Sequence, residues 1–366
     1  KIFNVLLVSF LIFSLNGFTQ EIDSLVFKTD RLLEFGIKNE AYPGAQVLIF
    51  KNDTIRLNKT YGFQTYDSLV PIEKHHLYDL ASVTKILAST LAFMKLYELY
   101  NLNLDQKVAT YVPSLKRSNK KNSSLREVLS HSGGWEPYIA HQNLVFNKRG
   151  RFKTRTISYK QNKKFPLQIS DSLFIHKKYF KKIYRRIRKT KLNNLGEYRY
   201  SGLWFFLLPE ITKQLSGSSF SEFLQTYFYT PLKTERLGFL PSKKYSKSEI
   251  VPTENDSIFR KQLVQGWVHD EAAAMMGGIS GNAGLFSNAA SLKPLLQMLL
   301  QNGNYNGKQY LKPETIKKFT QRSYPNSNNR RGLGFDKPSI DPESNYPSLL
   351  ASPSSYGHSG FTGTFI

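Results

Sequence analysis

Residues 82–100 read SVTKILASTLAFMKLYELY, and this stretch decides how the rest of the chain must fold. Its apolar side chains point to nearly every side of a helix that begins at Ser82 and ends at Tyr100. A helix that is apolar all round belongs in the interior of a domain. The sequence therefore predicts a buried helix, and Ser82 and Lys85 lie one turn apart on the same face at its start.

This Ser-x-x-Lys pair indicates a nucleophile at the mouth of the helix. The free N–H groups and the positive dipole end of a helix N-terminus favour a developing anion. A lysine amine in a closed pocket can lose its proton and act as a base for the serine. The alternative is an N-cap serine beside a surface lysine, the usual meaning of an isolated Ser-x-x-Lys. The apolar helix that follows favours the nucleophile.

Composition excludes several other chemistries. The chain has 366 residues, 40% of them hydrophobic and 21% charged, which is normal for a folded globular protein. It has no cysteine, so a disulfide scaffold, a thiol nucleophile and a Cys-ligated zinc site are ruled out. Its seven histidines form no cluster with ligand spacing, so we expect no metal and no cofactor. A Gly-x-Ser-x-Gly elbow is also missing, because 278–282 and 357–361 both lack the last glycine.

The N-terminus resembles a secretory signal. A basic start, an apolar run from Val5 to Leu15 and small residues at Gly17 and Thr19 predict a signal peptide over residues 1–20. The run is shorter than the ~20 residues of a membrane span, so we expect cleavage and an exported, periplasmic or extracellular protein.

The rest of the chain, residues 21–366, is expected to form a single α/β (α+β) domain. Strand signals near both ends predict a sheet layer from 21–80 and 271–366 around a helical region of 81–270. In the first part, a helix is expected over 23–36 and a hairpin over 45–57 with its turn at 51–53. Further expected elements are helices over 124–129, 202–215, 220–228 and 289–300, and a strand with a Gly-rich turn over 355–366.

Positive charge is concentrated in one segment. The formal net charge is +24, and residues 148–191 hold seventeen Lys or Arg and one acid, Asp171. One interpretation is contact with an anionic cell-wall or membrane surface. The other, which we favour, is a solvated helical face. Export makes nucleic acid the least expected partner.

Several motifs in a fixed order resemble the serine β-lactamase-like hydrolases: class C β-lactamases, D,D-carboxypeptidases of the penicillin-binding type and related esterases. The resemblance covers nearly the whole chain after residue 20. The motifs that carry it are Asp79-Leu80-Ala81-Ser82-Val83-Thr84-Lys85, Leu104-Asp105, Tyr111-Val112-Pro113, Leu129-Ser130-His131-Ser132-Gly133-Gly134, Tyr198-Arg199-Tyr200-Ser201-Gly202, Pro252-Thr253-Glu254-Asn255-Asp256, Val268-His269-Asp270-Glu271-Ala272, Gly281-Asn282-Ala283-Gly284-Leu285-Phe286 and Gly357-His358-Ser359-Gly360.

The resemblance implies a β-lactamase/transpeptidase-like antiparallel sheet flanked by helices, with further strands and a helix after position 366. It also implies roles for particular residues. Ser82 matches the acylated nucleophile, Lys85 its proton-handling partner and Tyr200 the tyrosine that acts with the lysine. The strand His358-Ser359-Gly360 matches the family's Lys-Thr-Gly, and the amides of Ser82 and Phe361 match the oxyanion hole. His131 and His269 are interpreted as loop-building residues.

Two positions depart from the family pattern. The second motif usually ends in Asn or Asp, and here it ends in Gly202. The third motif has His358 in place of lysine, and a neutral histidine grips a carboxylate less firmly. We therefore expect a serine hydrolase of small esters, D-amino-acid peptides from peptidoglycan or β-lactams, with esterase or peptidase activity favoured over a dedicated β-lactamase. The alternative is a non-catalytic relative that binds the cell wall through its basic face.

Overall fold

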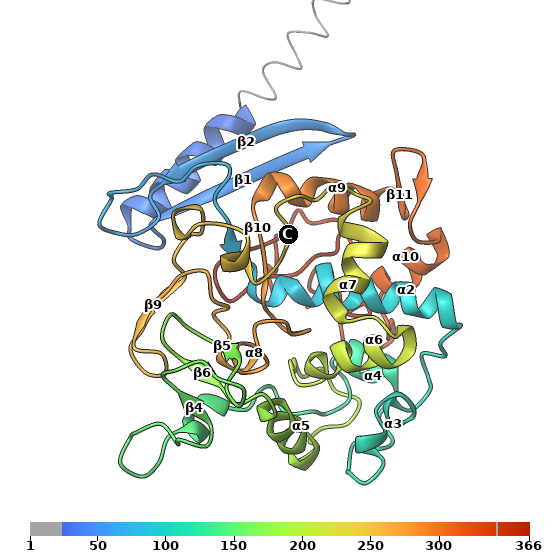
Figure 1. Cartoon of the computed structure of the whole chain (residues 1–366). Coiled ribbons are helices and arrows are strands. Elements are labelled where there is room, and N and C mark those ends of the chain that lie inside the picture. The colour runs from blue at the N-terminus through green and yellow to red at the C-terminus, as the bar shows by residue number, and fades with distance from the viewer. Residues whose placement is uncertain (1–23, 342) are drawn as a thin grey trace, which may run out of the picture. The chain divides into compact units, whose positions relative to one another are not determined.

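The computed structural model describes residues 24–341 and 343–366, and the predicted signal peptide lies outside them (Figure 1). The described chain falls into two compact units. One holds the residues up to His76 together with Asn288–Ala290, and the other holds Leu77–Ser287 and Ser291–Ile366. The division into an α/β part and a helical part stays a prediction. None of the helices in the described ranges has the length and apolarity that a bilayer crossing requires.

The first unit contains the predicted hairpin. Strands β1 (Gly44–Lys51) and β2 (Thr54–Gly62) pair antiparallel, with a bulge after Ile49. Asn52 and Asp53 connect them with φ of 48° and 66°. Two successive residues of positive φ form the tight turn that matches the right-handed twist of a hairpin, and Asn and Asp tolerate that backbone better than most residues.

A helix covers residues 24–38 of the same unit, close to the predicted range. Its Asp30 accepts hydrogen bonds from Lys59 and Tyr61 of β2, each at 2.7 Å. These polar contacts fix the helix against the hairpin, which Figure 1 shows in blue.

The buried helix lies where the sequence predicts it, but it is not a regular α-helix along its whole length. It begins with a 3-10 turn at Ala81–Val83, widens to a π-helical turn at Lys85–Thr90 and continues as α2, Leu91–Tyr100. Every residue of the π turn is buried. Two chain segments pass very close to this turn, because a Cβ on Gly281 would lie 2.6 Å from the Ser89 hydroxyl and a Cβ on Gly334 would overlap Thr90. Such widened turns often occur at functional sites.

Other helices of the second unit surround α2 (Figure 1). Helices α6 (Leu208–Ser216), α7 (Phe220–Leu224) and α10 (Pro313–Thr320) all contact it. The Phe319 ring of α10 meets the Tyr97 ring edge-on at 5.6 Å. The helix is therefore buried through Leu96, as predicted, whereas its last residues Leu99 and Tyr100 are exposed.

The helix predicted over 202–215 starts later than expected. A 3-10 turn at Phe205–Leu207 leads into α6 only at Leu208. Pro209 explains the boundary, because proline lacks an N–H and fits the first turn of a helix rather than its interior. The predicted helix 220–228 is α7 followed by a π turn at Gln225–Tyr229.

The remaining elements are short. Ser124 caps α4 through a capping box with Glu127, as its place before an apolar run predicts. Strands β3, β10 and β7 form an antiparallel sheet in that order. The bounds are β3 Tyr78–Asp79, α3 Val108–Tyr111, α4 Leu125–Leu129, β4 Ile157–Ser158, β5 Leu167–Gln168, β6 Phe174–Ile175, α5 Tyr179–Lys189, β7 Gly238–Phe239, β8 Glu254–Asp256, β9 Gln262–Val264, α8 Glu271–Met275, β10 Leu285–Ser287, α9 Ala289–Leu300, β11 Asn304–Tyr305 and β12 Lys308–Gln309.

The strand predicted for 355–366 is a hairpin held by a few bonds rather than a regular strand. The backbones of His358 and Ile366 exchange hydrogen bonds at 3.0 and 3.2 Å, and Gly363 turns the chain with φ of 87°. Ser359 and Phe365 form an isolated antiparallel bridge. The second-unit segment before it, around Asp336, pairs with Gly357.

Candidate active site

A tight turn after β3 presents Ser82. The buried Asp79 carboxylate accepts hydrogen bonds from the amides of Ala81, at 2.8 Å, and His269, at 2.6 Å. Ala81 has φ of 43°, a left-handed conformation that costs a non-glycine residue about 1–2 kcal/mol. The Asp79 hydrogen bonds stabilise this backbone, so the turn holds the Ser82 hydroxyl in one place.

Lys85 lies within hydrogen-bond distance of that hydroxyl. Its Nζ donates to Ser82 Oγ at 2.8 Å and to the Asn282 carbonyl at 3.1 Å. Lys85 is buried, whereas Ser82 is half-buried. Asn282 lies in the motif just before β10, and its carbonyl holds the Lys85 amine in place. The sequence had not predicted this function for Asn282.

Tyr200 completes a triangle with these two residues. The Lys85 Nζ lies 5.3 Å from the centre of the Tyr200 ring. Burial raises the pKa of the Tyr200 phenol. The charge of Lys85, hydrogen bonding by Lys85 and Ser82 to the phenol, and the charge of Arg331 together outweigh burial, so the pKa of Tyr200 lies below its ordinary value of 10. A phenol of this kind can give up and take back a proton.

The loop motif of residues 129–134 positions the tyrosine segment. His131 Nδ1 accepts the Ser201 N–H at 3.1 Å, and its ring lies 4.6 Å from the Tyr200 ring. Ser201 Oγ donates to the Glu136 carbonyl at 2.6 Å. His131 therefore touches Tyr200 and fixes the backbone beside it, in keeping with a loop-building role.

His358 lies at the same site, with its ring 5.9 Å from that of Tyr200. Burial lowers its pKa to about 3, and the charges of Arg331 and Lys85 add to the effect. The imidazole is therefore neutral at pH 7. Its Nδ1 is 2.6 Å from the Ser359 carbonyl, while its buried Nε2 has no hydrogen-bond partner among the described residues.

The segment after His358 lies against the turn that precedes Ser82. Thr362 Oγ1 donates to the Asp79 carbonyl at 2.7 Å and Thr364 Oγ1 to the Leu80 carbonyl at 3.2 Å. Gly360 passes so close that a Cβ there would lie 2.6 Å from the Leu80 carbonyl. The Phe361 side chain is exposed and stacks near His269, 5.2 Å between ring centres. The oxyanion roles of the Ser82 and Phe361 amides stay predictions.

Arg331 is the site residue that sequence analysis missed. It is 4% exposed, and its guanidinium lies 5.3 Å from the centre of the Tyr200 ring. In the sequence it is the second of two adjacent arginines, which are ordinarily surface residues. The glycines at 332 and 334 beside it were the available signal of close packing, since a Cβ at 332 would lie 2.5 Å from the Phe319 carbonyl.

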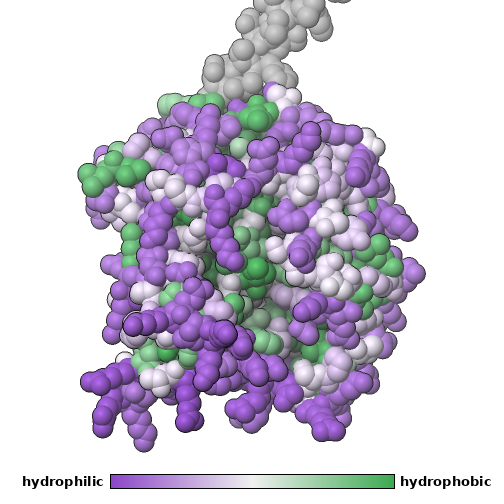
Figure 2. Space-filling model, in the orientation of Figure 1, coloured by the Kyte–Doolittle hydropathy of each residue, from purple (hydrophilic) through white to green (hydrophobic). Residues whose placement is uncertain are grey.

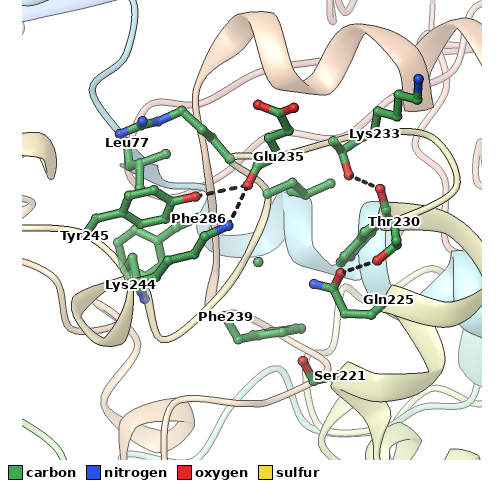
Figure 3. A pocket seen from close by; sticks show the side chains of 16 residues that line it. Leu77, Ser221, Gln225, Thr230, Lys233, Glu235, Phe239, Lys244, Tyr245 and Phe286 are labelled. Atoms are coloured by element: carbon green, nitrogen blue, oxygen red, sulfur yellow. Dashed lines mark hydrogen bonds between the residues drawn. The ribbon is translucent and has the colours of Figure 1, made fainter.

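A cavity of about 370 Å³ lies apart from these residues (Figure 3). Leu77, Phe239 and Phe286 form its apolar wall, and the Lys244 amine and Tyr245 hydroxyl both bond to the Glu235 carbonyl. Ser221 lines this cavity, but no hydrogen bond joins it to a basic side chain among the described residues. The candidate catalytic site is therefore the one at Ser82. Within residues 24–341 and 343–366, no three His, Asp or Glu side chains come together in a way that would hold a metal ion.

Comparison with known proteins agrees with this fold. The Beta-lactamase family profile matches residues 29–366, and the chain belongs to that family, as a serine hydrolase. An Escherichia coli K12 protein named "Putative D-alanyl-D-alanine carboxypeptidase" is 30% identical over 88% of this chain and 74% of its own length. The octameric penicillin-binding protein homologue from Pyrococcus abyssi matches with a TM-score of 0.65 at 21% identity, covering 92% of this chain and 68% of its own. A class C β-lactamase from Rhodobacter sphaeroides gives 0.55 at 18% identity, over 86% and 76%. The predicted family and fold class are confirmed.

Proposed function

We propose that this protein hydrolyses small esters or D-amino-acid peptides derived from peptidoglycan through an acyl-enzyme on Ser82. The observation that carries the proposal is the triangle of Ser82, Lys85 and Tyr200, in which the lysine nitrogen lies 2.8 Å from the serine oxygen and 5.3 Å from the centre of the tyrosine ring. Nucleophile and base within hydrogen-bond reach are the geometric requirement for covalent catalysis. The name of the Escherichia coli relative supports a D-alanyl peptide as the substrate class.

In the acylation step, the Tyr200 phenolate takes the proton of the Ser82 hydroxyl while the serine oxygen bonds to the substrate carbonyl carbon. Lys85 keeps the hydroxyl aimed and stabilises the phenolate through its positive charge. The tetrahedral oxyanion is bound by the amides of Ser82 and Phe361. Tyr200 then gives the proton to the departing alcohol or amine as its bond to the carbonyl carbon breaks.

Deacylation repeats these transfers with water. Tyr200 takes a proton from the water, whose oxygen attacks the ester carbon, and the phenol returns the proton to Ser82 as the acid leaves. His358 stays neutral in this scheme. It places an uncharged polar side chain beside Tyr200 and transfers no proton. A β-lactam would acylate the same serine.

The test is burst hydrolysis of a chromogenic acetate ester by the wild type and by Ser82→Ala. We expect a burst of about one product per enzyme in the wild type and none in the variant, with steady turnover reduced at least ~10²-fold, because no other nucleophile lies in the triangle. Equal inertness of the two proteins, with both retained on cell-wall polymer, would instead favour the non-catalytic binding protein.

A further inference from the structure

The surroundings of Tyr200 contain a second cation besides Lys85. Lys85 Nζ and the Arg331 guanidinium carbon each lie 5.3 Å from the centre of the Tyr200 ring. At such distances a cation is attracted to an aromatic face, and more strongly when both groups are desolvated. Arg331 is almost fully buried, so its charge acts on the phenol with little screening by water.

A carboxylate and a phenol hold this arginine in place. Arg331 Nη2 lies 3.2 Å from Asp336 Oδ2 and donates to the Tyr198 hydroxyl at 3.1 Å. The Arg331 N–H donates to the Asn329 side chain and its carbonyl accepts from Ser323, both at 2.9 Å. Backbone and head group are thus fixed at once, while Nε and Nη1 are buried with no hydrogen-bond partner among the described residues.

The charge of Arg331 is not cancelled locally. Asp336 is shared, since Arg330 also binds it, with Nε at 2.7 Å from Oδ1 and Nη2 at 3.1 Å from Oδ2. Two guanidinium groups and one carboxylate leave an excess of one positive charge. Arg330 stacks on Tyr198 and Tyr346, whereas Arg331 stacks on Tyr198 and Tyr200. The excess charge that reaches the site is therefore that of Arg331.

The third motif supplies no positive charge of its own. His358 is neutral and buried, so its position supplies no cation at neutral pH. Asp336, which holds Arg331, exchanges backbone hydrogen bonds of 2.8 and 3.0 Å with Gly357, the residue before His358. The arginine and the third motif are consequently parts of one hydrogen-bonded assembly.

We propose that Arg331 is a positioning residue of the catalytic centre, which orients the Tyr200 ring by stacking on it and provides the positive charge that His358 does not. This rests on the proposed function of Tyr200 as the proton carrier. The groups that face Tyr200 are Lys85, Ser82, Arg331, His131 and His358. The pKa values of both histidines are lowered, so neither imidazole adds a positive charge beside Tyr200 at neutral pH.

The experiment is a titration of the Tyr200 phenol by NMR in protein labelled with 13Cζ-tyrosine. The Tyr200 resonance is identified by its loss in Tyr200→Phe. We expect Arg331→Met to move the Tyr200 titration upward by about one pH unit and Arg331→Lys to restore most of the shift. Arg330→Met, the comparison variant, leaves the Arg331 guanidinium stacked on Tyr200 but paired with Asp336 alone, so it should move the Tyr200 titration upward by less than Arg331→Met does.

An unchanged Tyr200 titration in folded Arg331→Met would overturn the inference, as would an equal shift in Arg330→Met. The measurement needs no turnover, so it stays informative if the wild type fails to hydrolyse esters and the proposed function falls. If Arg331→Met does not fold, Arg331→Gln and Arg331→Lys are compared instead. Equal Tyr200 titrations in these two variants would overturn the role of the Arg331 charge. In an active enzyme, the rising limb of kcat/KM against pH moves with the titration.

Discussion

At the scale of single residues, two glycines near the site differ in whether a side chain would fit, Gly360 and Gly202. Gly360 has no room, because a Cβ there would lie 2.6 Å from the Leu80 carbonyl. Gly202 is different: a Cβ at 202 would meet only the Pro137 carbonyl, at 3.8 Å, and its φ is not in the left-handed region. The glycine that replaces the family's Asn or Asp is therefore not imposed by space or by backbone conformation.

Gly202→Ala is expected to raise stability by about 0.4–1 kcal/mol, because alanine restricts the unfolded chain while fitting the folded one. Ester turnover should stay within about twofold of the wild type. Urea unfolding and steady-state assays check both, with Gly360→Ala as the control that is expected to lose stability and activity. A destabilised Gly202→Ala would show that the position is closed.

At the scale of elements, the turn between β3 and the buried helix carries an electrostatic cost. Asp79 is 2% exposed, and burial raises its pKa from 3.8 to about 6 despite hydrogen bonds from the His269 and Ala81 amides. A carboxyl whose folded pKa is raised contributes stability that is present below pH 3.8 and lost as the pH rises through about 6. The ionised form is therefore the less favourable one for folding.

Asp79→Asn removes this dependence. Between pH 4 and pH 7 the wild type should lose roughly 2 kcal/mol of stability relative to the variant, since most of the effect of a shift of about two pKa units falls in this window. The absolute stability of the variant is lowered, because an amide offers one acceptor oxygen to two N–H groups. Unfolding free energies measured at several pH values give the difference, and parallel curves for the two proteins would contradict the account.

At the scale of the whole molecule, the basic segment and the catalytic residues are separate features of the sequence. Hydrophilic side chains gather over the region of α5 and β4–β6 (Figure 2). No residue of 148–191 hydrogen-bonds to or stacks on Ser82, Lys85, Tyr200 or His358 in the described chain. Asp171, the single acid of the segment, is paired with Lys247 at 2.5 Å.

Reversing Lys181, Arg185 and Lys189 to Glu tests this separation, because all three are exposed on α5. Each replacement removes two units of charge, so the formal net charge falls from +24 to +18. Turnover of a small neutral ester should stay within about twofold, and a collapse would mean that the segment serves the site. Arg186 is kept, since it donates to the Tyr179 hydroxyl at 2.9 Å and supports the fold.

The sequence predicted the central helix, the hairpin and the four residues Ser82, Lys85, Tyr200 and His358 that the structure brings together. The helix and the hairpin could be predicted because apolar periodicity and turn residues are local properties, whereas Tyr200 and His358 were predicted from the resemblance of their motifs to those of the family. It could not predict Arg331, whose burial depends on Asp336 and on rings from a distant segment, nor the π turn at Lys85–Thr90, which depends on packing against Gly281 and Gly334. Both are tertiary effects that no local pattern records.

The most direct test of the central claim is peptide-mapping mass spectrometry after incubation with a fluorophosphonate and, in a separate sample, with a penicillin. The account predicts that the fluorophosphonate adduct lies on the peptide that contains Ser82, that it is absent in Ser82→Ala, and that its rate falls in Lys85→Ala and Tyr200→Phe. A penicilloyl adduct on the same serine would place β-lactams among the acyl donors. Labelling of a different residue, or no labelling of folded wild-type protein, would contradict a nucleophilic Ser82.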